Sequence, residues 1–220
     1  MAEQLSTGKR RITVFLLVAL ALAVLAAPFF ILIHQYGKIF SNAENTIAGM
    51  ASLAALLAVS FLFLEVMIGS FSPLLVRVFN PPRLRRLHIV LGLFGLALAL
   101  AHFVLLTPKI GEHFSTDNRV FFIAGPIVLV LLIFTIATAL MSRKFSRSWR
   151  SIHVLNYFIL VIAIVHGLVI GDNTGMLALR LLFYGYLTFI FIGFVYRASN
   201  TGWRHSLKYR HRRKPAETNP

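Results

Sequence analysis

Long apolar runs separated by short polar segments dominate the pattern of this chain. A bilayer core about 30 Å thick is crossed by about 20 apolar residues in a helix. The joints between the runs contain Pro, Gly, Asn and Ser, which are typical of turns. Six windows are long enough to cross, and they cover residues 12–34, 46–70, 86–108, 119–141, 152–171 and 176–197. The pattern predicts an all-α membrane protein, a bundle of six transmembrane helices.

The composition agrees with this fold class and excludes several kinds of cysteine-dependent site. Hydrophobic residues make up 58% of the 220 residues and charged residues 13%, whereas soluble domains carry about 25% charged residues. This composition excludes an ordinary soluble domain. The chain has no cysteine, which excludes disulfides, thiolate metal sites and c-type haem attached through a C-x-x-C-H motif.

The net charge of +15 indicates membrane topology and not nucleic-acid binding, because the basic residues gather on one side of the predicted spans. Eighteen of the 22 lysines and arginines fall there: Lys9, Arg10, Arg11, Arg77, Arg83, Arg85, Arg86, Arg143, Lys144, Arg147, Arg150, Arg197, Arg204, Lys208, Arg210, Arg212, Arg213 and Lys214. The positive-inside rule then places both termini in the cytoplasm. An even number of spans also requires both termini to lie on one side of the membrane, so the two arguments agree.

Three regions follow from this division. Residues 1–11 form a cytoplasmic N-terminus, residues 12–197 form the six-helix domain, and residues 198–220 form a basic cytoplasmic tail. The tail is expected to be partly disordered and to lie against lipid headgroups. The first apolar run, of about 22 residues, exceeds the 7–15 residues of a signal peptide, so we expect it to stay as a helix.

Four histidines lie inside the spans, where ionisable residues are costly and are functional by default. His88 and His102 are 14 residues apart in the third span, and His153 and His166 are 13 residues apart in the fifth. At 1.5 Å per residue these steps are about 21 and about 19.5 Å. Both spans run in the same direction, so His88 and His153 (the inner pair) share one level and His102 and His166 (the outer pair) share another.

This arrangement suits two bis-histidine haems stacked across the membrane, because imidazole nitrogens are axial ligands of haem iron. The helical phase imposes one condition. Fourteen residues return an ideal helix almost to the same face, whereas thirteen leave it about 140° short of four turns. The fifth span must therefore bend, or its two haems must approach from different sides.

Other interpretations of the histidines stay open. They can act as polar residues that join helices in a haem-free transporter or scaffold. A zinc or other metal-transport path is disfavoured, because the pairs lie far apart and no carboxylate is expected to accompany them. Glu65 is the only carboxylate within a span. It is a candidate for proton relay, for contact with a quinol, or for a hydrogen bond between helices.

At these residues the chain resembles a known family. The runs Arg-Arg-Leu-His at 85–88 and Trp-Arg-Ser-Ile-His at 149–153, with His102 and His166, resemble the ferric-reductase-like transmembrane domain of ferric reductases and NADPH oxidases. The resemblance covers roughly residues 46–197. The stretches 91–102 and 149–166 are also similar to the haem-binding membrane subunit of the bacterial periplasmic methionine sulfoxide reductase system. That subfamily usually lacks a histidine at the position of His88.

The resemblance implies two b haems, the inner bound by His88 and His153 and the outer by His102 and His166. It implies transmembrane electron transfer by an oxidoreductase membrane subunit of a bacterial inner (plasma) membrane. About 23 residues follow Arg197, without G-x-G-x-x-G, so no flavin or nicotinamide domain is expected there. The expected donor is a separate flavoprotein or a quinol, and the expected acceptor is a ferric chelate, oxygen or a periplasmic reductase.

Three arginines are candidates for holding haem propionates, because the guanidinium fork matches a carboxylate. Arg86 and Arg150 lie closest in sequence to the inner pair, although positive-inside topology already explains both. Arg180, near the outer end of the sixth span, is the candidate for the outer haem. Its alternatives are a side chain that reaches the membrane surface, or an ion pair with Asp172.

Overall fold

The computed structural model describes residues 7–35, 43–107, 119–141, 149–171 and 176–212. Within these ranges the chain is helical, with no strand. The helices are α1 (Thr7–Gln35), α2 (Ala43–Ser70), α3 (Ser72–Leu75), α4 (Pro81–Leu106), α6 (Arg119–Leu140), α7 (Trp149–Ile170) and α8 (Leu177–Arg212).

The prediction of six membrane-spanning helices is confirmed. Long apolar stretches lie within the six long helices, at Gly8–Ile33, Thr46–Ser70, Pro81–Leu106, Val120–Leu140, Ser151–Ile170 and Leu177–Asn200. Each is at least 20 residues long, enough to cross the hydrocarbon core. The protein is a multi-pass integral membrane protein of the all-α class.

Two boundaries differ from the sequence prediction. Helix α4 begins at Pro81, five residues before the predicted window, because proline is well suited to the first turn of a helix. Helix α8 continues to Arg212, so the prediction of a partly disordered tail is wrong for residues 198–212. This stretch contains no proline and mostly residues compatible with a helix.

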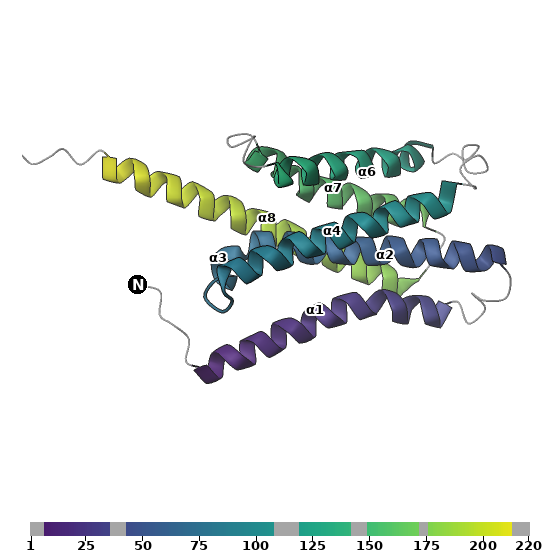
Figure 1. Cartoon of the computed structure of the whole chain (residues 1–220), viewed down its shortest axis with the longest axis horizontal. Helices are drawn as coiled ribbons and strands as arrows, with labels where there is room; N and C mark the ends of the chain where they lie inside the picture. The colour runs from purple at the N-terminus through teal and green to yellow at the C-terminus, as the bar shows by residue number, and fades with distance from the viewer. Residues whose placement is uncertain (1–6, 36–42, 108–118, 142–148, 172–175, 213–220) are drawn as a thin grey trace, which may run out of the picture.

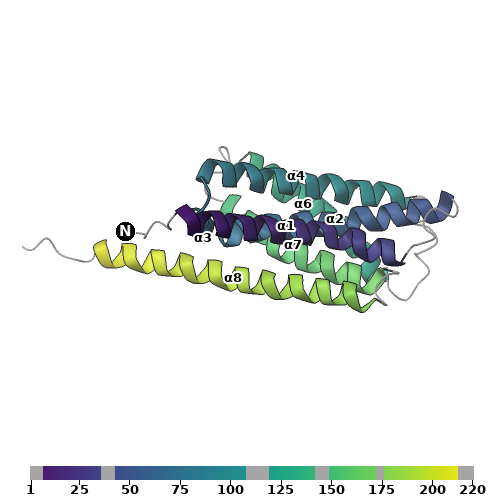
Figure 2. The same cartoon turned by 90° about the horizontal axis from the view of Figure 1, so that it is seen from below.

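Helix α2 occupies the centre of the bundle, where it packs against α1, α4, α7 and α8. Helix α6 packs mainly against α7 and also against α4 (Figures 1 and 2). Helix α1 begins and α8 ends at the same end of the bundle (Figure 1). This agrees with termini on one side of the membrane, while the cytoplasmic identity of that side stays a prediction.

Glycines bring α4 close to α2. A Cβ atom at Gly95 would lie 2.7 Å from Cγ of Leu62 and 3.4 Å from the carbonyl oxygen of Ala58. At Gly92 it would lie 3.4 Å from Cγ of Glu65. Small residues allow this approach in membrane bundles, where close packing holds helices together. The fold therefore presses one face of α4 onto α2.

Buried polar contacts attach α7 and α8 to the same central helix. The Ser60 hydroxyl of α2 is hydrogen-bonded to Tyr186 of α8 at 3.0 Å, and Ser70 to Tyr157 of α7 at 2.7 Å. Phe63 stacks on Tyr186 with ring centroids 4.2 Å apart. Each such side-chain hydrogen bond contributes about 0.6–2 kcal/mol within a bilayer. Helix α2 is thus fixed against α7 and α8, in addition to α4.

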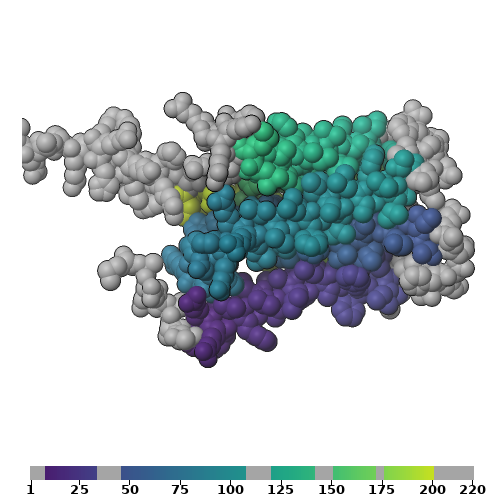
Figure 3. Space-filling view, in the orientation of Figure 1, coloured from purple at the N-terminus to yellow at the C-terminus, as the bar shows by residue number. Residues whose placement is uncertain are grey.

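One face of the molecule is covered by α1, α4 and α6, in that order across the bundle (Figure 3). Their outward side chains are large and apolar, as at Phe15, Phe94 and Val130. Such a surface suits contact with acyl chains, because hydrocarbon offers no partner to polar groups. Polar chemistry is consequently concentrated in the interior, around α2.

Candidate histidine sites in the bundle

Both histidines of α4 are held by carbonyl groups of α2. The Nδ1 atom of His88 lies 3.1 Å from the backbone carbonyl oxygen of Glu65, and Nδ1 of His102 lies 2.9 Å from the backbone carbonyl oxygen of Ala51. His102 follows His88 by 14 residues, and Ala51 precedes Glu65 by 14. Because the two helices are antiparallel, equal spacing on both places the same kind of contact at two depths.

The structure brings the inner pair together. The rings of His88 and His153 have centroids 5.6 Å apart and are inclined at 74°. A carboxylate oxygen of Glu65, Oε1, lies 3.0 Å from Nε2 of His88 and 3.8 Å from Nε2 of His153. One ligand atom from each of the three residues lies within 4.8 Å of the others. Two nitrogens on opposite sides of one metal are about 4 Å apart, so the inner pair suits a shared metal.

The expectation that no carboxylate accompanies the histidines is wrong for the inner pair. Glu65 is buried, with 5% of its surface exposed, and its partners are both inner histidines. Its position follows from depth, since Glu65 lies five residues before the end of α2 and His88 seven residues after the start of α4. Counting depth on antiparallel spans would have placed them at one level, although not on facing sides of their helices.

The outer pair is held differently. The Nδ1 atom of His166 lies 2.7 Å from the backbone oxygen of Phe121 on α6, while His102 is held by Ala51 of α2. The two outer rings are near enough to interact electrostatically. Among the described side chains, no acidic group accompanies them. The outer pair therefore consists of imidazoles oriented by backbone alone.

The two histidines of α7 face different neighbours. His153 approaches Glu65 on α2, whereas His166 contacts Phe121 on α6. Thirteen residues leave an α-helix well short of a whole number of turns, which explains the difference. Of the two possibilities that the spacing allows, a bent span or groups approaching from different sides, these contacts support the second.

Hydrogen bonding selects the same tautomer at His88, His102 and His166. A carbonyl oxygen only accepts, so each Nδ1 must carry the proton and donate it. At His102 and His166 the Nε2 atom then keeps its lone pair, whereas Nε2 of His88 shares a proton with Oε1 of Glu65, 3.0 Å away. Histidines that bind metals commonly donate their second ring N–H to a carbonyl in this way. The donor chemistry of the two outer side chains fits the axial ligation of a haem, and His88 fits it once Glu65 gives up its contact with Nε2.

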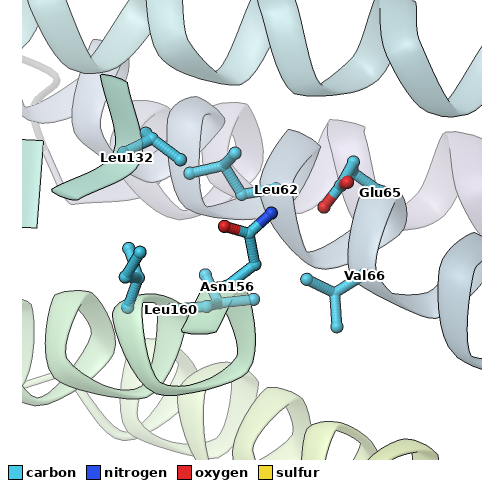
Figure 4. Close-up of a pocket in the computed structure, with 7 residues that line it drawn as sticks. Leu62, Glu65, Val66, Leu132, Asn156 and Leu160 are labelled. Atoms are coloured by element: carbon cyan, nitrogen blue, oxygen red, sulfur yellow. The ribbon is translucent and has the colours of Figure 1, made fainter. Parts of the chain in front are cut away.

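The Nδ1 atom of His153 has the side chain of Asn156 as a neighbour. Nδ2 of Asn156 lies 3.4 Å from its Nδ1, and the buried Oδ1 of Asn156 has no hydrogen-bond partner among the described residues. This amide lines a small cavity with room for about one water molecule, beside Glu65 (Figure 4). The sequence prediction missed Asn156. The available signal was its position three residues after His153, on the same helical face.

The structure places the three predicted arginines in different ways. Arg86 is exposed and lies two residues from His88, which is about 200° around a helix. Arg180 is also exposed, near the start of α8. Arg150 belongs to the first turn of α7, but its side chain lies outside the described residues. Their roles toward propionates stay predictions.

Comparison with known proteins adds no identification. The chain matches no protein-family model, and searches of curated proteins and of solved structures give no significant match. The resemblance to the ferric-reductase-like domain is therefore carried by the histidine-containing runs alone.

Proposed function

We propose that this protein is a dihaem b membrane cytochrome that carries electrons across the bilayer, with the inner pair and the outer pair as axial ligands. The observation that carries the proposal is the placing of two histidines at each of two depths, on α4 and α7. In His102 and His166, a carbonyl holds Nδ1 and leaves Nε2 available, whereas Nε2 of His88 faces Glu65. Haem iron with two imidazole ligands supplies one-electron transfer without an open position for oxygen.

The protein's own contribution is to fix two sites in series. His88 and His102 are separated by 14 residues on one helix, a rise of about 21 Å. Helix α2 holds both imidazoles in a single orientation, and so sets the vertical distance between the sites. The core around α2 is mostly apolar, which limits the access of bulk water to the interior.

The packing of the helices is compatible with flat groups between α4 and α7. These two helices pack mainly against other partners, α4 against α2 and α7 against α6. At the inner level the contact across the seam is made by the imidazole rings of His88 and His153. A haem bound between α4 and α7 would need space between these helices. It would therefore need helices that are bridged by their histidines and not closely packed.

The direction of transfer in this proposal runs from a donor on the cytoplasmic side to an exterior acceptor. A separate flavoprotein or a quinol would donate at the inner level. A ferric chelate, oxygen or a periplasmic reductase would accept at the outer level. These assignments follow the resemblance to the ferric-reductase-like family, with the bacterial inner membrane as the expected location.

An optical spectrum of the detergent-purified protein tests the proposal. Dithionite-reduced minus oxidised difference spectra, with haem counted per chain, should give b-type bands and two haems. One haem per chain would remove one of the pairs as a site. Colourless protein from cells with ample haem would reject the proposal in favour of a haem-free transporter or scaffold, in which the same hydrogen bonds only join helices.

A second candidate is favoured by the carboxylate of Glu65. Two imidazoles and one carboxylate form a ligand set that binds zinc, and with open positions also non-haem Fe(II). In this alternative the inner site holds a divalent metal ion directly, as part of a metal-transport path or a metal-dependent enzyme. Metal analysis of the same purified protein separates the two: about one zinc or non-haem iron per chain, without b-type bands, would support the ion.

A further inference from the structure

The turn of α6 around Gly125 supports His166 closely. A Cβ atom built on Gly125 would lie 2.9 Å from Cε1 of His166, 3.2 Å from Nε2 and 3.5 Å from Nδ1. The first distance is shorter than a real Cβ contact allows. Any side chain at position 125 would thus push the imidazole away from α6, and only glycine leaves the ring where it is.

The same turn supplies the hydrogen-bond acceptor. Phe121, whose oxygen accepts from Nδ1 of His166 at 2.7 Å, precedes Gly125 by four residues, one turn along α6. The bond is short, so a displacement of the ring by a few tenths of an ångström would stretch it. A single turn of α6 therefore supplies both the space for the His166 ring and the hydrogen bond that fixes its tautomer.

Pro126 adjoins this turn but does not free the carbonyl that His166 uses. Proline has no backbone N–H, so Pro126 within α6 cannot donate to the carbonyl of Phe122, four residues earlier. The Phe121 carbonyl lies four residues before Gly125, which does have an N–H. The contact of Phe121 with His166 therefore follows from the close approach of α7 to α6 at Gly125.

We propose that Gly125 is a positioning residue for the outer site. Because it leaves room for the His166 ring against α6, it fixes the tautomer of the ring and the direction of its Nε2 atom. It thereby sets the affinity and the electronic character of the outer haem. This inference rests on the proposed haem function. It assigns α6, which carries none of the four histidines, to the construction of one site and not the other. The inner pair is held by α2 and has no such contact with α6 among the described residues.

The test compares Gly125→Ala and Gly125→Val with Gly185→Ala in the purified full-length protein. At Gly185 of α8 an added Cβ meets nothing within 4 Å, so this control carries the same glycine-to-alanine change in helix propensity without the clash. Haem per chain, haemin titration and electron paramagnetic resonance of the low-spin haems are measured. The inner haem reports in every sample that the protein is folded.

Outer-haem affinity should fall about 10–100-fold in Gly125→Val, as for loss of a residue that orients a metal ligand. Gly125→Ala should keep more haem but alter the outer resonance, while the inner resonance and Gly185→Ala stay as in wild type. Equal loss of both haems, or outer signals unchanged in both variants, would overturn the role of Gly125. Wild-type protein without haem would instead refute the proposed function, so the two failures are distinguishable.

Discussion

The inner and outer levels of this bundle use the same residue type in different surroundings. At the inner level, His88 and His153 face the buried carboxyl group of Glu65, and beside them lies an amide whose oxygen has no hydrogen-bond partner in the described part of the chain. At the outer level, His102 and His166 are held by backbone carbonyls of α2 and α6. The inner level thus contains an ionisable carboxyl group, and the outer level is shaped by backbone position and by the absence of a side chain at Gly125.

This difference matters for two sites in series. A carboxylate near a metal favours its more oxidised, more positive state, because the attraction of opposite charges is strong where water is excluded. An outer site without such a group favours the reduced state relative to the inner one. In the proposed cytochrome, the contrast would make electron flow from the inner to the outer level downhill when Glu65 is ionised.

Removing a histidine should have the largest effect and tests the comparison directly. His102→Ala or His166→Ala should remove the outer haem and leave one haem per chain, with transfer to exterior acceptors abolished. His88→Ala or His153→Ala should remove the inner haem. Haem counting and stopped-flow reduction in proteoliposomes measure both. Unchanged haem content in any of these variants would refute the assignment of ligands.

Glu65→Gln separates the two candidate functions. If the inner pair binds haem, the variant should retain two haems, and at a pH high enough to ionise Glu65 the inner midpoint potential should rise because a negative charge is lost. If the inner pair and Glu65 bind a divalent ion, zinc affinity should fall at least about tenfold, and the protein should contain no haem. Potentiometric titration and metal analysis provide the measurements. An unchanged inner potential in a haem-bearing protein would contradict the proposed difference between the levels.

Asn156→Leu should have a smaller effect, limited to the inner level. Leucine has a similar volume, removes the buried unpaired oxygen and ends the contact with His153. Removing one partner of a buried hydrogen bond can cost about 1–3 kcal/mol, so some loss of stability is expected. We expect two haems, a changed inner electron paramagnetic resonance signal and an unchanged outer one. A change at the outer level would show that the two sites are not independent.

Tyr186→Phe should have the smallest effect and serves as a control between the levels. The variant removes the hydrogen bond to Ser60 of α2, which lies between Glu65 and Ala51 along the helix. A stability loss of about 0.6 kcal/mol is expected, with both haems retained. Thermal unfolding in detergent followed by haem absorbance provides the measurement. Loss of either haem would mean that this contact supports a site and not only the packing of α8.

Much of the fold could be predicted from the sequence, because membrane helices are defined by length and hydropathy. The six windows agree with the spans to within about five residues at each end. The end of α8 could not be predicted in this way. Hydropathy marks where a helix leaves the membrane, but residues 198–212 continue it with polar side chains that have adequate helix propensity.

The candidate sites could be predicted in part. Spacing identified which histidines share a level, and it predicted the phase difference within α7. Spacing could not show that Glu65 points at the inner pair, since that depends on the rotation of α2 against α4. Nor could it show that Gly125 admits His166, which depends on the distance between α6 and α7. Both are properties of packing between helices, and local patterns do not encode them.

The antiparallel match between α2 and α4 limits how the sequence can change over evolution. Glu65 and Ala51 are separated by the same 14 positions as His88 and His102. Inserting one residue between the first two would turn Ala51 by about 100° relative to Glu65, and His102 would lose its acceptor while His88 kept its own. Insertions and deletions should therefore be rare within 51–65 and 88–102, and should be tolerated in the segments that connect the spans.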